Sequence, residues 1–216
     1  GEGAYVRYEM WLRDLETAVN SVVGLSGSFF AARRELCRPW PDHLPSDFNV
    51  LLNTVKSGRR GVADPASVGY YPNIADEHKE FDRKVRTVLR GLSVVMHNLE
   101  FFNPVRYGLF SWQLVSHKLC RWLAPFALVA ALMSNGFLLG EGAVYGALLL
   151  GQATWYLVAA IGIAWPRRLS HRLVKIPMYF VLVNVSIAAA WCRYVIGQRA
   201  TTWEPSRREP MSVSAP

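Results

Sequence analysis

Three long runs of apolar residues occupy the second half of the chain, at positions 122–139, 143–165 and 176–192. None of them contains Asp, Glu, Lys or Arg. A helix needs ~20 apolar residues to cross a bilayer, where every backbone polar group must be satisfied within the segment. We therefore predict membrane helices here, preceded by a soluble region of mixed polar and apolar residues.

In the soluble region, the pattern predicts helices separated by short extended segments. Apolar residues at helical spacing favour an amphipathic helix over 4–20, and a strand or tight loop follows over 21–30. A second helix is predicted from Asp47 to about position 58, then a short strand over 60–63 and a charged helix over 76–90.

The stretch from 91 to 117 has one apolar face. Its apolar residues recur every three or four positions, as in a helix: Leu92, Val95, Met96, Leu99 and Phe102. Because the stretch directly precedes a membrane helix, we predict that it lies in the membrane interface. The alternative is a helix packed on a soluble core, which has the same periodicity.

The net charge of the 216 residues is +8. Much of the excess flanks the apolar runs, at Lys118, Arg121, Arg167, Arg168, Arg172 and Lys175. This placement favours contact with an anionic membrane leaflet. A nucleic-acid partner is not expected, since it would require a basic stripe interleaved with exposed aromatic residues.

The distribution of cations also predicts an orientation in the membrane. The loop at 140–142 carries only Glu141, whereas the loop before the third run is basic. The positive-inside rule therefore places the soluble region and the basic loop in the cytoplasm, on an inner (plasma) membrane. Cations flank the third run on both sides, so the sequence leaves open whether this run crosses or re-enters.

Cysteines and histidines predict no metal or disulfide site. The three cysteines, Cys37, Cys120 and Cys192, are widely dispersed, which argues against a disulfide framework. The five histidines show no ligand spacing, so no metal site is predicted within the chain.

Asp47 is the first residue that could carry chemistry. It follows Pro45 and Ser46 at the start of a predicted helix, where a carboxylate can be held rigidly as a general base. The alternative is a capping role, because Ser and Asp are common residues at a helix N-terminus.

Two further sets of residues could bind phosphate groups or a sugar. Arg83, Arg86 and Arg90 share a helix face and could clamp a pyrophosphate, although a solvated face paired with nearby acidic residues has the same pattern. Gly24 and Gly27 could belong to a phosphate or sugar loop, or could simply allow close packing.

Taken in order, these residues resemble the second half of membrane-bound family 2 glycosyltransferases, the group that includes cellulose, chitin and hyaluronan synthases. The resemblance covers nearly the whole chain. It rests on these pieces: Tyr8-Glu9-x-Trp11-Leu12 with Glu16; Gly24-x-x-Gly27 with Arg33-Arg34-Glu35-Leu36; Ser46-Asp47-Phe48; Gly58-x-Arg60; Arg83-Lys84-Val85-Arg86; Trp112-Gln113-x-x-Ser116-His117-Lys118 with Arg121-Trp122; and Trp203-Glu204-Pro205.

The resemblance implies an α/β fold: the acceptor half of a GT-A-like domain over 1–90, followed by the interfacial segment over 91–117, transmembrane helices over 118–197 and a polar tail over 198–216. It implies that Asp47 is the catalytic base and that Arg83 and Arg86 lie at the donor pyrophosphate and acceptor. Gly24, Gly27 and Ser28 would form the acceptor loop.

The family also carries an earlier nucleotide-binding half, in which an Asp-x-Asp motif holds a divalent metal, Mg or Mn. This sequence has no Asp-x-Asp. The resemblance therefore places residue 1 just after that half and the metal ligands outside this chain, which alone is expected to be inactive.

The sequence thus predicts an inverting transfer of sugar from a nucleotide donor, most simply a UDP-sugar, to a saccharide or lipid-linked acceptor. Two alternatives remain. One is a small non-processive transferase with a lipid-linked acceptor. The other is a non-catalytic membrane-anchored protein that docks lipids or a partner subunit.

Overall fold

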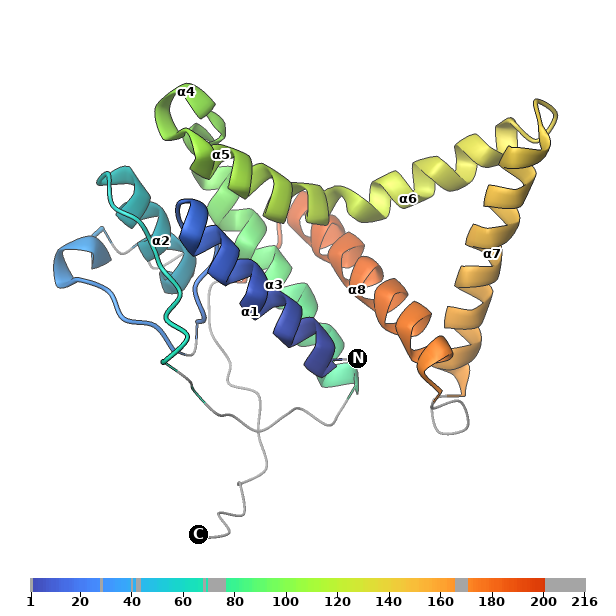
Figure 1. The fold of residues 1–216 in the computed structure, drawn as a ribbon, viewed down its shortest axis with the longest axis horizontal. Helices are drawn as coiled ribbons and strands as arrows, with labels where there is room; N and C mark the ends of the chain where they lie inside the picture. The colour runs from blue at the N-terminus through green and yellow to red at the C-terminus, as the bar shows by residue number, and fades with distance from the viewer. Residues whose placement is uncertain are drawn as a thin grey trace, which may run out of the picture.

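The computed structural model describes residues 2–27, 29–39, 41, 44–67, 69, 77–165 and 171–200. Its regular elements are helices (Figure 1). The α-helices are α1 (Glu2–Val19), α2 (Ser46–Lys56), α3 (Glu77–His97), α4 (Pro104–Tyr107), α5 (Leu109–Gln113), α6 (Cys120–Phe137), α7 (Ala143–Ala164) and α8 (Arg172–Val195). Short 3₁₀ turns occur at Arg34–Cys37 and Leu99–Phe102, and a π-helical segment at Leu114–Leu119.

The expected α/β, GT-A-like half-domain is wrong, because the described residues contain no strand. The segment 60–63, predicted as a strand, and the segment 21–30, predicted as a strand or tight loop, do approach each other. However, they share one backbone hydrogen bond, from Val22 N to Gly61 O at 3.1 Å, where a β-ladder needs a repeating series. Val22 and Val23 are buried in the core, so their β-branched side chains fill apolar space without forming a sheet.

The core of the soluble region is formed by the loop after α1, by α2 and α3, and by the beginning of the long helix that starts at Leu109. It contains Val22, Val23, Phe48, Leu51, Leu52, Val85, Leu89, Leu92, Phe101, Phe110 and Leu114. Leu92 and Val95, which the sequence assigned to a lipid-facing stripe, are fully buried in this core. Their periodicity therefore reflects packing on protein, the alternative that the sequence left open.

The helices α5 and α6 and the π-helical segment between them form one continuous helix, Leu109–Phe137. Its beginning belongs to the soluble region, since Phe110, Gln113 and Leu114 are buried there. From Leu123 onward its apolar side chains are exposed or half-buried, apart from the buried Pro125. The helix therefore changes after Trp122 from a protein-covered segment to a largely exposed apolar one, as expected of a helix that enters a membrane.

Three helices are long and apolar enough to cross a membrane: Leu109–Phe137, Ala143–Ala164 and Arg172–Val195. They match the three predicted apolar runs and indicate a membrane protein. Figure 1 shows α6 and α7 meeting at a turn and α8 closing the third side of a triangle. Which membrane is involved and how the chain is oriented stay predictions.

A close contact between α3 and α6 predicts an effect on stability. A Cβ at Gly91 would stand 2.8 Å from Cζ2 of Trp122, a rigid and buried ring. We expect Gly91→Ala to cost about 1–3 kcal/mol, because the indole must shift within a packed core.

Thermal unfolding in detergent measures this effect. Gly136→Ala on α6 is the matched control, since a Cβ there meets nothing within 4 Å. Equal melting temperatures for the two variants would contradict the predicted contact.

Candidate functional site

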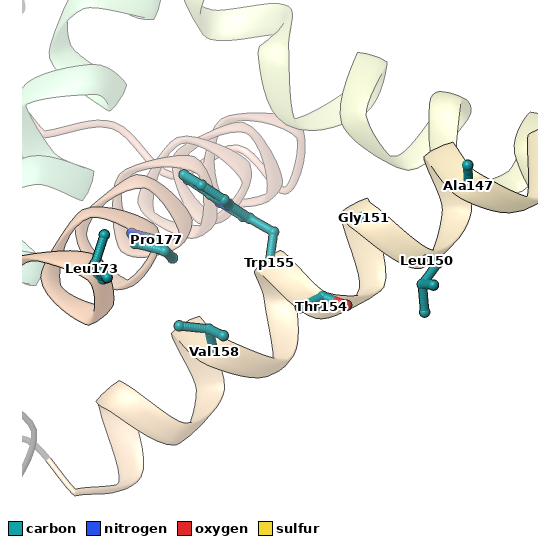
Figure 2. Close-up of a pocket in the computed structure, with 8 residues that line it drawn as sticks. All are labelled: Ala147, Leu150, Gly151, Thr154, Trp155, Val158, Leu173 and Pro177. Atoms are coloured by element: carbon teal, nitrogen blue, oxygen red, sulfur yellow. The ribbon is translucent and has the colours of Figure 1, made fainter. Parts of the chain in front are cut away.

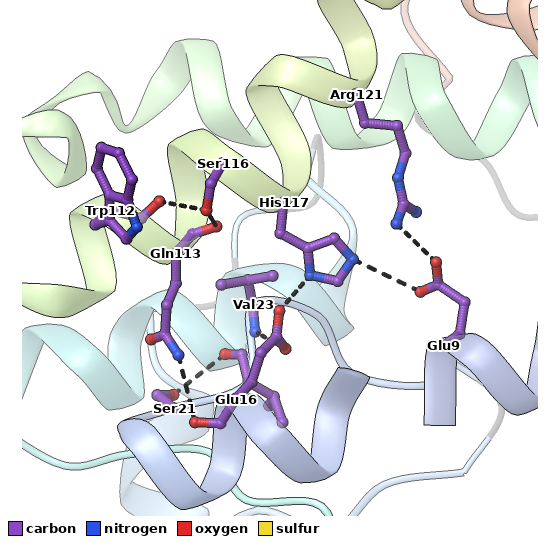
Figure 3. Close-up of polar contacts among 10 residues, drawn as sticks. Glu9, Glu16, Ser21, Val23, Trp112, Gln113, Ser116, His117 and Arg121 are labelled. Atoms are coloured by element: carbon purple, nitrogen blue, oxygen red, sulfur yellow. Dashed lines mark hydrogen bonds and ion pairs between the residues drawn. The ribbon is translucent and has the colours of Figure 1, made fainter. Parts of the chain in front are cut away.

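A cluster of charged side chains joins α1 to the long helix at the point where that helix leaves the soluble region (Figure 3). We call Glu9, Glu16, His117 and Arg121 the polar cluster. His117 Nδ1 contacts the Glu16 carboxylate, and its Nε2 lies 3.8 Å from Glu9 Oε2. Arg121 Nη2 donates to Glu9 Oε1 at 2.7 Å.

Glu16 is the buried centre of this cluster. Its second carboxylate oxygen accepts a hydrogen bond from Val23 N at 3.1 Å, and its backbone oxygen accepts one from Gln113 Nε2 at 3.3 Å. With His117 protonated on both nitrogens, the cluster holds two negative and two positive charges. A buried charge is stable only when paired in this way.

His117 and Lys118 lie in the π-helical segment Leu114–Leu119, and their side chains contact different parts of the protein. His117 points toward Glu16 and Glu9 in the polar cluster, whereas Lys118 reaches the loop that contains Gly24. A Cβ at Gly24 would lie 3.2 Å from Lys118 Nζ, and Nζ sits 4.2 Å from the centre of the Phe48 ring. π-Helical turns often occur at functional sites, because the extra residue reorients the neighbouring side chains.

Asp47 lies beside the same loop, next to Gly27. A Cβ at Gly27 would stand only 2.9 Å from Asp47 Oδ2, so the carboxylate packs directly against the glycine backbone. Asp47 is also among the charges that act on Lys118. The structure thus brings together Gly24, Gly27 and Asp47, three residues that the sequence selected, and adds Lys118.

The capping alternative for Asp47 finds no support in the described contacts. The helix α2 begins at Ser46 after Pro45, with Asp47 in its first turn. None of the hydrogen bonds described for residues 44–67 ends on the Asp47 carboxylate. A half-buried carboxylate beside a glycine loop can accept a proton from a bound hydroxyl group.

The two arginines predicted to bind pyrophosphate are on α3, and the described contacts do not join them to Asp47. Arg83 donates through Nε and Nη2 to both oxygens of Glu80, at 2.7 and 2.6 Å. Partial burial raises the pKa of Glu80, but hydrogen bonds and charge from Arg83 and Lys84 outweigh this and leave it below its usual value. Arg86 is half-buried on the same helix.

Two groups of sequence-selected residues lie outside the described part of the chain. They are Ser28 of the predicted acceptor loop and the motif Trp203-Glu204-Pro205. Within the described part, no group of three or more His, Cys, Asp or Glu side chains could hold a metal ion.

A groove of about 510 Å³ lies between α7 and α8 (Figure 2). Its lining is apolar apart from Thr154, and consists of Ala147, Leu150, Gly151, Thr154, Trp155, Val158, Leu173 and Pro177. The groove offers no acid, base or charged group, so we assign the candidate chemistry to the Asp47 region.

Sequence reasoning did not select Glu9, Glu16, His117, Lys118 or Arg121 as site residues. A signal was present, because all five belong to the sequence pieces on which the predicted resemblance to glycosyltransferases rests. In addition, Lys118 and Arg121 are charges directly before an apolar run. What the sequence lacked was the pairing, since Glu16 and His117 are 101 positions apart.

No family model, no curated protein and no solved structure matches this chain.

The polar cluster predicts a large stability difference between two glutamates. Glu16→Ala leaves His117 and the Val23 amide without their buried partner, so we expect a loss of about 3 kcal/mol or more. Glu35→Ala removes an exposed pair with Arg59 and is the matched control, with a cost of about 1 kcal/mol or less.

Thermal unfolding of both variants in the same detergent compares them. A Glu16→Ala protein as stable as Glu35→Ala would show that the cluster does not hold α1 to the long helix.

Proposed function

We propose that this chain is the acceptor side and membrane part of an inverting glycosyltransferase. Asp47 accepts the proton of the attacking hydroxyl while the acceptor oxygen bonds to the sugar carbon and the bond to the nucleotide diphosphate breaks. The products are the glycosylated acceptor, the nucleotide diphosphate and a protonated Asp47, which later releases its proton to water. The donor is a nucleotide sugar, most simply a UDP-sugar, and the acceptor a saccharide or a lipid-linked hydroxyl.

The observation that carries the proposal is the convergence of separate pieces of the resemblance. The Gly24–Gly27 loop, Asp47 and Lys118 come from three distant segments. A Cβ at Gly24 would lie 3.2 Å from Lys118 Nζ, a Cβ at Gly27 would lie 2.9 Å from Asp47 Oδ2, and Lys118 Nζ lies 4.2 Å from the centre of the Phe48 ring. The proposal rests on these residues and does not depend on an α/β fold.

Cations near the base have a role in such a reaction, because negative charge develops on the departing diphosphate. Lys118 is a cation on which the charge of Asp47 acts, and the ion pairs in the described part of the chain do not include it. Arg83 and Arg86 stay in the proposal as pyrophosphate ligands, and Arg83 would exchange Glu80 for phosphate. The divalent metal, Mg or Mn, belongs to the donor half that the resemblance places outside this chain.

Replacing the base tests the reaction. We expect Asp47→Asn in the full natural protein to lower sugar transfer by about 10²–10⁴-fold, the usual contribution of a general base. Transfer of radiolabelled sugar from a panel of UDP-sugars is measured in membranes that contain equal amounts of each variant.

Asp64→Asn is the matched control, because Asp64 is an exposed carboxylate that hydrogen-bonds within its own loop. Unchanged transfer by Asp47→Asn would rule out the proposed base. If the unsubstituted protein transfers sugar from no nucleotide donor, the glycosyltransferase proposal fails and the membrane-docking alternative replaces it.

The glycine beside the base provides a more subtle test. An alanine Cβ at position 27 would approach Asp47 Oδ2 to 2.9 Å, so the carboxylate must move by a few tenths of an ångström. We expect Gly27→Ala to lower kcat by roughly tenfold with little loss of stability, because small displacements of catalytic groups are costly.

Gly140→Ala is the control, since a Cβ there meets nothing within 4 Å. Transfer kinetics and melting temperature are measured together. A Gly27→Ala protein with normal kcat would show that the position of the carboxylate does not limit the reaction.

A further inference from the structure

The helix α8 differs from the other two apolar helices in how much of it is covered by protein. In the most apolar part of α8, 28% of residues are buried, against 11% for each of the other two candidate spans. Ser186, Ile187 and Ala190 are almost completely inaccessible. A lipid-spanning helix at the edge of a small bundle has no need of such a covered face.

Much of the cover comes from the charged helix α3, along which α8 packs, and α7 and α6 also contact α8. Ile187 and Ala190 belong to the same core cluster as Val85, Leu89 and Leu92, with Val183 packed against it. Further toward the start of α8, Lys84 Nζ lies 5.3 Å from the centre of the Tyr179 ring and is paired with Glu80. Charged groups at this point argue against hydrocarbon around that face, because burying them in lipid is costly.

The opposite face of α8 is apolar and uncovered. In the second half of the helix, Val185, Cys192 and Ile196 are exposed at spacings of seven and four, on the side opposite Val183, Ile187 and Ala190. The second half of α8 therefore has one face packed on protein and an opposite apolar face that is exposed.

Both ends of α8 carry positive charge. Both ends also lie on the same side of the membrane as the soluble region if α6 and α7 cross. Arg172 and Lys175 are exposed in its first turn, and Arg199 follows its end, donating to Tyr194 O at 2.8 Å. Directly after α8, Ala200 packs against the soluble core. If α6 leads away from the soluble region and α7 returns, α8 begins and ends on the side of that region.

We propose that α8 lies in the headgroup region of an anionic membrane leaflet, with its covered face on α3 and its apolar face toward the acyl chains, and that only α6 and α7 cross. In Figure 1, α8 is then the base of the triangle and the turn between α6 and α7 its apex. At 1.5 Å per residue, the 18 residues of α6 and 22 of α7 give sides of about 27 and 33 Å, which suits a hydrocarbon core of ~30 Å.

The proposal commits α8 to lipid as the occupant of its open face for two reasons. The helix packs against α7 and α6, the two helices proposed to cross, and cations at its two ends match anionic headgroups. It does not depend on the proposed reaction, so it can stand or fail separately.

Single-cysteine labelling tests the topology. In the full natural protein with Cys37, Cys120 and Cys192 changed to Ser, one exposed residue at a time becomes Cys: Ser57→Cys in the soluble region, Glu141→Cys at the apex, Leu173→Cys and Gln198→Cys at the ends of α8. A membrane-impermeant maleimide is applied to sealed vesicles of known orientation before and after permeabilisation.

The expected result is that positions 57, 173 and 198 react from one side and position 141 from the other. Reaction of position 198 from the side of position 141 would overturn the proposal, because α8 would then cross. Reaction of all four positions from one side would overturn it too, since α6 and α7 would not cross.

Depth measurement provides a second, independent readout. A bimane label on native Cys192, as the single cysteine, is compared with one on Val129→Cys in the middle of α6, using lipids with a nitroxide at acyl carbon 5 or carbon 12. We expect Cys192 to be quenched at least twofold more by the shallow nitroxide and Val129→Cys more by the deep one. Deeper quenching at Cys192, or no quenching by either lipid, would overturn the interfacial position.

Discussion

One buried carboxylate, Glu16, determines how the soluble helices meet the membrane part. It holds the Val23 amide through one oxygen and His117 through the other, while its backbone oxygen binds Gln113. Apart from Glu16, α1 contributes little to the core, and its residues Tyr8, Trp11 and Leu15 are exposed. The position of α1 therefore depends on polar contacts, and so does the register of the long helix that carries Lys118 toward Gly24 and Asp47.

The charges of this region are arranged where the long helix changes its surroundings. Arg121 lies in the first turn of α6 and is the only charged residue of that helix, and its Nη2 donates to Glu9 Oε1 at 2.7 Å. One residue later, Trp122 is buried against Gly91, and its backbone oxygen accepts a hydrogen bond from Trp191 on α8 at 2.9 Å. Paired charges on one side and an indole anchored between α3 and α8 on the other fix the depth at which apolar exposure begins.

Sequence reasoning located the helices better than their contacts. Helices near 4–20, 47–58 and 76–90 and the three apolar runs were predicted, because periodicity and hydropathy report local structure directly. The strand at 60–63 was wrong, and of the two alternatives for 21–30, a strand or a tight loop, the described residues form a loop, since Val22 and Val23 are apolar for burial and have no ladder to join. Periodicity also cannot say which phase covers a face: Trp11 is exposed, whereas Leu92 lies in a protein core. The proximity of Asp47 to Gly27 needed either the fold or a resemblance to a known family.

The helix α8 shows the same limit for hydropathy. By that measure its central part is the most apolar of the three candidate spans, and yet it is the most covered by protein. Hydropathy records how favourable it is for a side chain to leave water, and a protein core and a bilayer both satisfy that requirement. The distinction comes from neighbours: Ile187 and Ala190 meet Leu89 and Leu92, and the cations at both ends remain in contact with water or headgroups. A helix placed in this way can join a soluble region to the leaflet beneath it without crossing.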